Sequence, residues 1–478
     1  MTALAEFKTH VAAFQRKTRT ALNLPGLFQA KFSRPGLILG ARMGNAGLVA
    51  RLLKPQIVRI QKAAPETAEP VNAVVLPKPG FIEDITASIG LDPRFNIYVL
   101  RREALKFIAQ SFFPDTVDDN TYGIGEPAIE SGKPALRALW RDVWRRINAD
   151  MGLDIVLTGN FSYFAEQELA AAAEADGTAF VALHKENLKT PGLEPMYEDI
   201  YRDRKMPFQG SLIATYNEIE RGIQARAGTF PADRIKVAGM PRLDQLHHWR
   251  ERHAGRDVSI DSRPTVLFMS YNEKTGCPFI GRKTAAGQET LADELDAVRW
   301  NDLVVQGHRA IAELARRNPD LRVVIKTKDH GWALGALRRG LGESFQPPTN
   351  LEIVSGGDPF ELIVAADVLA GFNSTSLFEA LAANVPIVSL DFAEAADPRF
   401  SPYVVDLGEA ADRASSPEEF IELLAARARQ RSARARRGEL GEAQKNMLAH
   451  WVGNPDGRSG ERVIALVLGH LEARRGVH

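Results

Sequence analysis

Short apolar runs alternate along the chain with longer stretches in which apolar residues recur every three or four positions. Continuous apolar runs are typical of strands buried on both faces of a parallel sheet, and the helical spacing between them predicts crossover helices. The strands predicted in the first half are 96–100, 154–157, 180–183, 212–215 and 235–238. Those predicted in the second half are 266–269, 322–326, 351–354, 368–371 and 387–391.

Two successive series of similar size predict an α/β protein with two Rossmann-like domains that face each other across a cleft. The main helices are expected at 165–175, 304–316, 360–366, 376–383 and 461–475. A Pro- and Glu-rich stretch at 63–72 is interpreted as a linker, and the polar stretch 250–264 as the connection between the domains. The predicted parts are an N-terminal extension (1–68), a first domain (69–250), a second domain (258–425) and a C-terminal helical tail (440–478).

Composition agrees with this organisation. A chain of 478 residues is longer than one hydrophobic core usually fills, and 45% hydrophobic with 25% charged residues is ordinary for a globular protein. The sequence contains no apolar run of roughly 20 residues and no secretory pattern at its start, so we expect a cytoplasmic location. A single cysteine, Cys277, excludes an internal disulfide and a multi-cysteine metal site.

The formal net charge is +0, but the first part of the chain is strongly basic. Eleven lysines and arginines precede Glu66, against Glu6 alone, and aromatic and aliphatic residues lie between them. Two interpretations stay open: peripheral contact of residues 1–62 with an anionic membrane surface, or a solvated face of a helical subdomain. A second basic run, 427–437, carries alanines and no aromatics, which favours a solvated helix over a nucleic-acid surface.

The segment 367–379, DVLAGFNSTSLFE, carries the strongest chemical signal. A strand ends there in a polar turn and a helix begins at once, so free backbone N–H groups and the positive helix end lie beside hydroxyls. A helix cap needs one hydroxyl, whereas Ser374, Thr375 and Ser376 supply three, which indicates a phosphate site. Glu379, one turn into the helix, is expected either to hold a ribose hydroxyl or to complete a capping box with Ser376.

Two further strand ends of the second half carry polar groups. Lys326, Lys328 and His330 provide three potential cations that would complement one or two phosphates. Ser270 and Asn272 begin a long loop at the side of the domain that faces the cleft, and loops of this length often act as lids. All five residues are therefore predicted to bind the nucleotide part of a donor.

In the first half, His184 and Glu186 follow a predicted strand. Either could deprotonate an acceptor hydroxyl across the cleft, and the alternative is an ordinary charged surface loop. Arg242 and Asp244 follow the last strand of this half. Arg242 is expected either to pair with Asp244 and fix the hinge or to point to the donor, and we favour the hinge.

Several familiar motifs are missing from the sequence. It has no GxxxxGK[ST] loop, no HExxH, no CxxC and no Asp-x-Asp at a strand end. We therefore expect no metal and no cofactor besides the donor substrate. Lysines and the helix dipole would then neutralise a departing phosphate.

Three segments, IKVAGMPRLD (235–244), VVIKTKDH (323–330) and AADVLAGFNSTSLFEALAANVPIVSLD (365–391), resemble GT-B glycosyltransferases, in particular bacterial surface-carbohydrate biosynthesis proteins of the capsule and lipopolysaccharide type. The third segment looks like the one in which related enzymes bind donor phosphate and ribose. The Lys-x-Lys-x-His element is similar to the Lys-x-His-Pro motif of capsule-type transferases that use CMP-activated acidic sugars. Here Gly331 takes the place of the proline.

The resemblance implies a metal-independent glycosyltransferase that moves a sugar from a nucleotide-sugar donor to a cell-surface polysaccharide or lipid-linked glycan. Its nucleotide domain would be the second one and its acceptor domain the first, at the cytoplasmic side of the inner membrane. No nucleic-acid partner is expected. Three alternatives share the architecture: a UDP-sugar 2-epimerase, a CDP-polyol phosphotransferase and a non-catalytic nucleotide-binding assembly protein.

Overall fold

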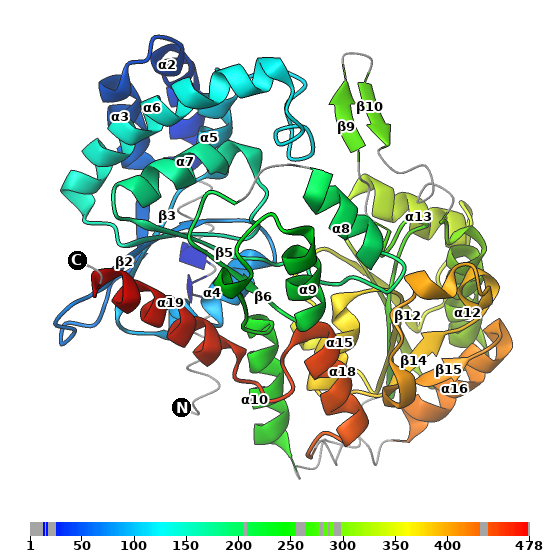
Figure 1. Cartoon of the computed structure of the whole chain (residues 1–478). Coiled ribbons are helices and arrows are strands. Elements are labelled where there is room, and N and C mark those ends of the chain that lie inside the picture. The colour runs from blue at the N-terminus through cyan, green and yellow to red at the C-terminus, as the bar shows by residue number, and fades with distance from the viewer. Residues whose placement is uncertain are drawn as a thin grey trace.

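The computed structural model describes residues 13–14, 16–17, 25–203, 208–254, 263–277, 281–284, 287–290, 298–430 and 438–476. It contains two separate, mainly parallel sheets, each covered by helices on both faces (Figure 1). The predicted fold class, α/β with two Rossmann-like domains, is confirmed.

The N-terminal sheet has seven strands in the order β1-β3-β2-β4-β5-β6-β7, in which β1 is antiparallel to β3 and the remaining pairs are parallel. Its strands are β1 (Val58–Gln61), β2 (Val71–Leu76), β3 (Phe95–Val99), β4 (Ile155–Thr158), β5 (Ala179–Leu183), β6 (Leu212–Thr215) and β7 (Ile235–Val237). The helices around it are α2 (Pro25–Arg42), α3 (Ala46–Leu53), α4 (Phe81–Thr86), α5 (Arg102–Ala109), α6 (Pro127–Met151), α7 (Phe164–Ala175), α8 (Glu194–Asp203), α9 (Glu218–Ala227) and α10 (Asp244–His253).

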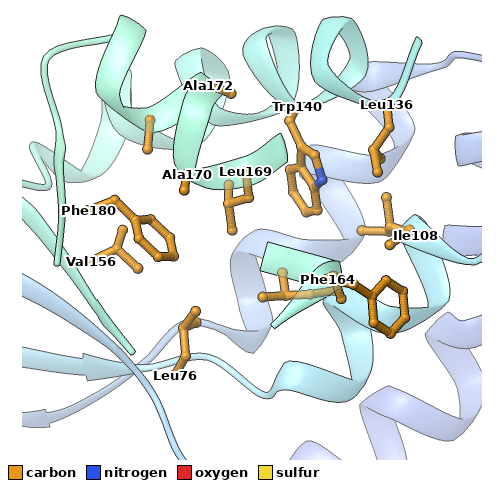
Figure 2. Packing of buried hydrophobic residues seen from close by; sticks show 14 of the residues in the cluster. Leu76, Ile108, Leu136, Trp140, Val156, Phe164, Leu169, Ala170, Ala172 and Phe180 are labelled. Atoms are coloured by element: carbon orange, nitrogen blue, oxygen red, sulfur yellow. The ribbon is translucent and has the colours of Figure 1, made fainter. Parts of the chain in front are cut away.

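Successive residues of these strands enter two different cores, because side chains alternate across a sheet. Leu76, Val156 and Phe180 pack with Trp140 of α6 and Leu169 of α7 on one face (Figure 2). The adjacent strand positions pack on the opposite face against α4 and the last helix of the chain. Burial on both faces explains why the strands are continuous apolar runs.

The C-terminal sheet has six parallel strands in the order β12-β11-β8-β13-β14-β15. They are β8 (Thr265–Met269), β11 (Arg322–Thr327), β12 (Leu351–Ser355), β13 (Val368–Gly371), β14 (Ile387–Leu390) and β15 (Asp412–Ala414), with a hairpin of β9 (Gly281–Thr284) and β10 (Gly287–Thr290). The covering helices are α12 (Asn301–Arg317), α13 (Gly331–Leu341), α14 (Phe360–Ala365), α15 (Thr375–Ala382) and α16 (Pro417–Arg429). The strand order reverses between β8 and β13, and ligands of doubly wound sheets bind at such a switch point.

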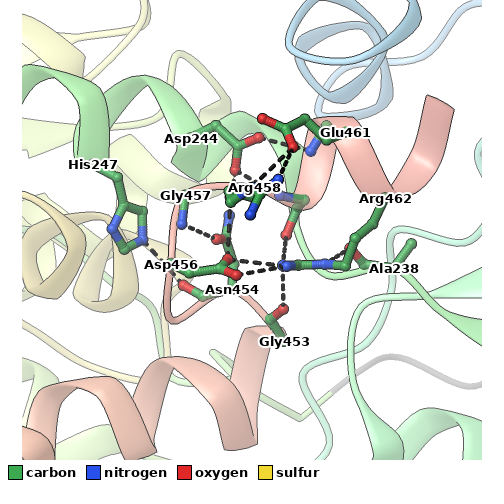
Figure 3. A network of polar contacts seen from close by, with 12 residues as sticks. Ala238, Asp244, His247, Gly453, Asn454, Asp456, Gly457, Arg458, Glu461 and Arg462 are labelled. Carbon is green, nitrogen blue, oxygen red and sulfur yellow. Dashed lines mark hydrogen bonds and ion pairs between the residues drawn. The ribbon is translucent and has the colours of Figure 1, made fainter. Parts of the chain in front are cut away.

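The last two helices join the domains (Figure 1). Helix α18 (Glu442–Val452) packs against α15, and α19 (Ser459–Arg475) returns to the N-terminal sheet, where Val463, Val467 and Leu471 enter its core. At the start of α19 the buried Asp244 accepts hydrogen bonds from Asn454 Nδ2 (2.7 Å), Ser459 N (3.1 Å) and Gly460 N (2.7 Å) (Figure 3). A carboxylate there satisfies backbone N–H groups that the helix leaves unpaired.

Two glycines allow the segment before α19 to pass close to the backbone that follows β6 and β7. Gly239 and Gly453 both have positive φ, and a Cβ on Gly453 would lie 1.9 Å from the Tyr216 carbonyl oxygen. A Cβ on Gly239 would lie 2.1 Å from Ser459 Oγ. Both positions therefore require glycine for conformation and for space.

The N-terminal part of the chain differs from the expected separate extension and linker. Residues 58–61 form β1, and the predicted linker 63–72 overlaps the start of β2 at Val71. Helices α2 and α3 pack on α5 and α6, and Leu37, Val49 and Leu53 belong to the same core as the sheet. Strand β1 (VRIQ) is short and partly exposed, and the apolar residues of β2 (VNAVVL) follow directly on the Pro- and Glu-rich stretch that was interpreted as a linker. Of the predicted connection 250–264, residues 255–262 lie outside the described part.

Replacement of Asp244 by alanine would leave three donors at the start of α19 without their acceptor. We expect Asp244→Ala to reduce the free energy of unfolding by about 2–4 kcal/mol, since each buried unpaired group costs ~1–3 kcal/mol. Scanning calorimetry would measure a fall in the unfolding midpoint of several degrees. The control is Asp456→Ala, because Asp456 pairs with Arg462 at a half-exposed position. An equal midpoint shift in both variants would contradict this role of Asp244.

Candidate functional site

A cavity of about 480 Å³ lies between the two domains at the carboxyl ends of their strands. We call it the interdomain cavity, and its size is in the range of small-molecule sites. The first domain contributes the segment after β5, Tyr197 of α8 and Tyr216 after β6. The second contributes the ends of β8, β11 and β13, and α18 supplies Trp451 and Val452. The lining residues are Lys185, Glu186, Asn187, Leu188, Lys189, Tyr197, Tyr216, Ser270, Tyr271, Lys274, Thr275, Gly276, Cys277, Lys328, Ala333, Phe372, Asn373, Ser374, Thr375, Trp451 and Val452.

The predicted phosphate turn borders this cavity. Asn373 has a left-handed φ of 44°, and its side chain donates to Tyr403 O (2.9 Å) and accepts from Val405 N (2.8 Å). Ser374 caps α15 by accepting from Ser376 N (3.3 Å). Ser374 and Thr375 line the cavity, whereas the buried Ser376 does not. The structure thus brings two of the three predicted hydroxyls to the cavity, beside a helix N-terminus.

The loop after β8 packs directly on that turn. Gly276 has φ +79°, and a Cβ there would lie 2.5 Å from Asn373 Nδ2. Asn272 faces its own loop, because its Oδ1 accepts from Lys274 N (2.9 Å) and Thr275 Oγ1 (3.1 Å). It shapes the loop and is not a lining residue, contrary to the prediction. Burial raises the pKa of the Cys277 thiol to about 11, so this lining residue stays protonated at neutral pH.

Four lysines and one glutamate are the charged side chains among the lining residues. Lys185 and Lys189 come from the first domain, and Lys274 and Lys328 come from the second. This excess of positive charge suits an anionic ligand such as a phosphate. Of the three predicted cations, only Lys328 lines the cavity.

The other two predicted cations lie elsewhere. Lys326 is buried and donates to the carbonyl oxygens of Gly356 (2.5 Å) and Thr327 (3.2 Å), which joins the ends of β11 and β12. His330 is an exposed residue at the N-cap of α13 and is absent from the cavity lining. Sequence spacing placed these side chains at the correct sheet edge but did not determine the direction in which they point.

Glu186 reaches the cavity from the first domain, as predicted. Its side chain is 54% exposed, and its Oε1 lies 3.1 Å from Lys185 Nζ. Burial alone would raise the pKa of Glu186, but Lys185, Lys189 and His184 together lower it to about 2. The carboxylate is therefore ionised at neutral pH.

His184 lies behind the cavity wall instead of in the cavity. Its ring is 1% exposed, packs edge-on against Phe161, and has Nε2 3.2 Å from Glu220 Oε1. The chain leaves β5 at Leu183, so the strand alternation no longer predicts which way His184 and Glu186 face. The prediction that His184 is an alternative base is wrong, because no acceptor can reach a ring that is this deeply buried.

Glu220 is a buried residue that the sequence analysis missed. It receives hydrogen bonds from Tyr201 OH (3.0 Å) and Gln224 Nε2 (2.7 Å), and its Oε2 lies 3.8 Å from Lys189 Nζ. Lys189 in turn donates to the carbonyl oxygen of Glu186 (2.5 Å). Glu220 thus holds the segment that presents Glu186. This role could not be predicted from the sequence, because Asn217 and Glu220 have the spacing of an ordinary helix cap.

Arg242 and Glu379 come from segments that meet at the domain border, since residues Pro241–Leu243 contact α15. Arg242 pairs with Asp84 (3.4 Å) and donates to Gly80 O (3.0 Å) and to the hydroxyl of Tyr216 (3.3 Å). The expected pairing of Arg242 with Asp244 is therefore wrong, since Asp244 holds α19. Glu379 does not line the cavity. Burial raises its pKa to about 7, and the charge of Arg242 opposes that rise.

Within the described ranges, no three His, Cys, Asp or Glu side chains gather as a metal site would require. Among the same residues, no helix has both the length and the apolar character to cross a membrane.

Glu220 gives a pH-dependent prediction. Burial would raise the pKa of Glu220, but Lys189 and His184 lower it below the ordinary 4.5. A lowered carboxyl pKa stabilises the fold at pH values above 4.5, and this contribution disappears as the pH falls through the folded-state value. We expect Glu220→Gln to cost about 3 kcal/mol at pH 7, because it leaves Lys189 buried without its acid.

Urea unfolding at pH 7 and at progressively lower pH would measure this difference. We expect the gap between wild type and Glu220→Gln to narrow below pH 4.5. The matched control is Glu218→Gln on the same helix, because the pair of Glu218 with Arg221 is exposed. A gap that stays constant with pH would contradict the ionised state of Glu220.

Comparisons with known proteins show similarity of structure only. No protein-family model matches the chain, and no curated protein sequence matches it. Solved structures that resemble it include the UDP-GlcNAc 2-epimerase of Neisseria meningitidis bound to UDP-GlcNAc, with 14% identity, coverage of 84% of this chain and 99% of that chain, and a TM-score of 0.45. The UDP-GlcNAc 2-epimerase of Methanocaldococcus jannaschii has 13% identity, the same coverage of 84% and 99%, and a TM-score of 0.45. The trehalose-6-phosphate synthase of E. coli bound with UDP-2-fluoro glucose is also similar, with 12% identity, coverage of 84% of this chain and 98% of that chain, and a TM-score of 0.44. At these TM-scores we infer no reaction or ligand from them.

Proposed function

We propose that the interdomain cavity binds a nucleotide-activated sugar and that the protein transfers the sugar to an acceptor, as a GT-B glycosyltransferase. One observation carries this proposal: Ser374 and Thr375, at the switch point and at a helix N-terminus, face lysines from both domains across one cavity. The arrangement combines backbone N–H groups, hydroxyls and ammonium groups, which are the ligands that phosphates prefer.

The donor phosphates would lie against Ser374, Thr375 and Lys328. As the bond between sugar and phosphate breaks, negative charge develops on the departing phosphate oxygen. Lys328 and the N-terminus of α15 border the same cavity, and charge that is in place before the reaction would stabilise the transition state. Lys185 and Lys189 would draw the first domain toward the same phosphates.

Glu186 would orient the acceptor hydroxyl and receive its proton. A carboxylate with a pKa of about 2 is ionised but is a weak base. Its low pKa depends on Lys185 and Lys189, so donor phosphates that neutralise these lysines would raise it. Binding of the donor would thereby strengthen the base at the moment when it is needed.

For the acceptor we propose a lipid-linked or polysaccharide glycan, with peripheral contact of the first domain at a membrane. Leu39 and Met43, one helical turn apart, are 55% and 66% exposed beside Arg42, and this combination suits an anionic bilayer surface. We expect Leu39→Ser with Met43→Ser to reduce cosedimentation with vesicles that contain anionic lipid. Equal sedimentation of wild type and the double variant would contradict this contact.

The proposed base role makes a kinetic prediction. Glu186→Gln should reduce kcat by about 10²- to 10⁴-fold, the usual contribution of a general base. It should leave nucleotide affinity equal or higher, because it removes a negative charge from a cavity for anions. Steady-state transfer assays and calorimetric titration would measure the two quantities.

The control for this prediction is Glu198→Gln, since Glu198 of α8 pairs with Arg202 on the same helix and with Arg226 on α9 and does not line the cavity. Incubation with a UDP-sugar alone tests the epimerase alternative. Formation of an isomeric sugar nucleotide without any acceptor would contradict the transferase proposal, as would unchanged kcat in Glu186→Gln.

A further inference from the structure

A serine in the wall of the interdomain cavity is hydrogen-bonded to a buried histidine behind it. Ser270 follows β8 and lines the cavity, and its Oγ lies 2.9 Å from Nε2 of His308. His308 belongs to α12 and is completely buried, with ring contacts to Phe268 and Tyr271. The transfer mechanism proposed above uses neither residue.

The hydrogen bonds of His308 determine which atom carries its proton. Its Nδ1 lies 2.7 Å from the carbonyl oxygen of Val304, which can only accept, so Nδ1 must donate. Burial lowers the pKa of His308 to about 4, so the ring is neutral at neutral pH and Nε2 carries no hydrogen. The Ser270 hydroxyl therefore donates its only proton to Nε2 and turns its lone pairs to the cavity.

A glycine on the neighbouring helix α13 leaves room for the His308 side chain. A Cβ at Gly340 of α13 would lie 2.6 Å from His308 Cβ, so a larger residue there would displace the ring. Ser270 N donates to Lys326 O (2.8 Å), which fixes the serine backbone beside β11. Both partners of the Ser270–His308 hydrogen bond are thus held in place before any ligand binds.

We propose that His308 makes Ser270 an obligatory hydrogen-bond acceptor, and that Ser270 selects an O–H or N–H group of the nucleoside. This inference rests on the proposed nucleotide site. The nucleoside is the part concerned, because Ser270 belongs to the domain of the phosphate turn and follows β8, the strand next to β13 at the switch point. A phosphate oxygen would meet lone pairs at Ser270, whereas a ribose hydroxyl or a base N–H would meet an acceptor.

Binding of matched nucleotides tests the selection. The parent ligand is whichever of UDP, CDP, GDP and ADP binds the wild-type protein most tightly by calorimetry. Its 2′-deoxy, 3′-deoxy and base N-methylated forms each lack one donor, which separates the ribose from the base as the source. We expect one of these forms to bind wild type about 10- to 100-fold more weakly than the parent.

In Ser270→Ala this difference should shrink to about twofold or less, because the parent loses affinity and the donor-lacking form does not. The matched control is Ser389→Ala on β14, whose hydroxyl donates to Asp412 O and does not line the cavity. That variant should keep the full difference. Equal weakening of all ligands by Ser270→Ala, or no weakening of any, would overturn the proposal.

Nitrogen NMR of wild-type His308 tests the hydrogen-bond direction without any ligand. A neutral ring protonated at Nδ1 supports it, and a proton at Nε2 overturns it. Failure of every nucleotide to bind would overturn the proposed function and the selection with it. Binding without the selective effect of Ser270→Ala would overturn the selection alone.

Discussion

The return of the chain from the second domain to the first is the constraint on which the rest of the structure depends. Between α18 and α19 the backbone is held by direct hydrogen bonds: Asn217 Nδ2 to Trp451 O (2.5 Å), Met240 N to Val452 O (2.9 Å) and Asn454 Nδ2 to Met240 O (2.9 Å). Trp451 and Val452 also line the interdomain cavity. The same contacts therefore set the relative position of the domains and form part of the cavity wall. The close approach of Gly239 and Gly453 makes this possible.

The charge that lines the cavity between the two domains is mainly positive. Lysines from both domains line the cavity with a single carboxylate, that of Glu186, and Lys185 and Lys189 of the first domain keep its pKa low. Behind the wall, Glu220 offsets part of the charge of Lys189 and keeps the segment after β5 in position. In the proposed mechanism, recognition of phosphate and control of the base would be coupled, because both involve the same lysines. Ser270, with its proton position fixed by His308, would add a second, uncharged kind of selectivity.

Much of the fold followed from sequence pattern because the strands are buried on both faces and therefore lack polar residues. The strand ends followed as well, and Ser270, Lys328, Ser374, Thr375 and Glu186 all line the cavity. Side-chain direction beyond a strand end did not follow. His184 and Lys326 turn into the protein, toward the carboxylate of Glu220 and the carbonyl oxygen of Gly356, which lie far along the chain. Asn272 turns into its own loop, where its side chain accepts from Lys274 N.

Local sequence pattern also could not predict the lining residues that come from distant segments of the chain. Lys189, Tyr216, Trp451 and Val452 carry no motif and become lining residues only when the two sheets face each other. Glu220 matched an ordinary helix cap, and its second role depends on burial next to Lys189. The strand β1 is four residues long and partly exposed, so its apolar signal is weak.

A crystal structure of the protein soaked with the tightest-binding nucleoside diphosphate would test the central claim most directly. We expect the diphosphate within hydrogen-bond distance of Ser374, Thr375 and Lys328, between the two domains. A nucleotide bound outside the interdomain cavity, or phosphates turned away from the N-terminus of α15, would contradict the claim.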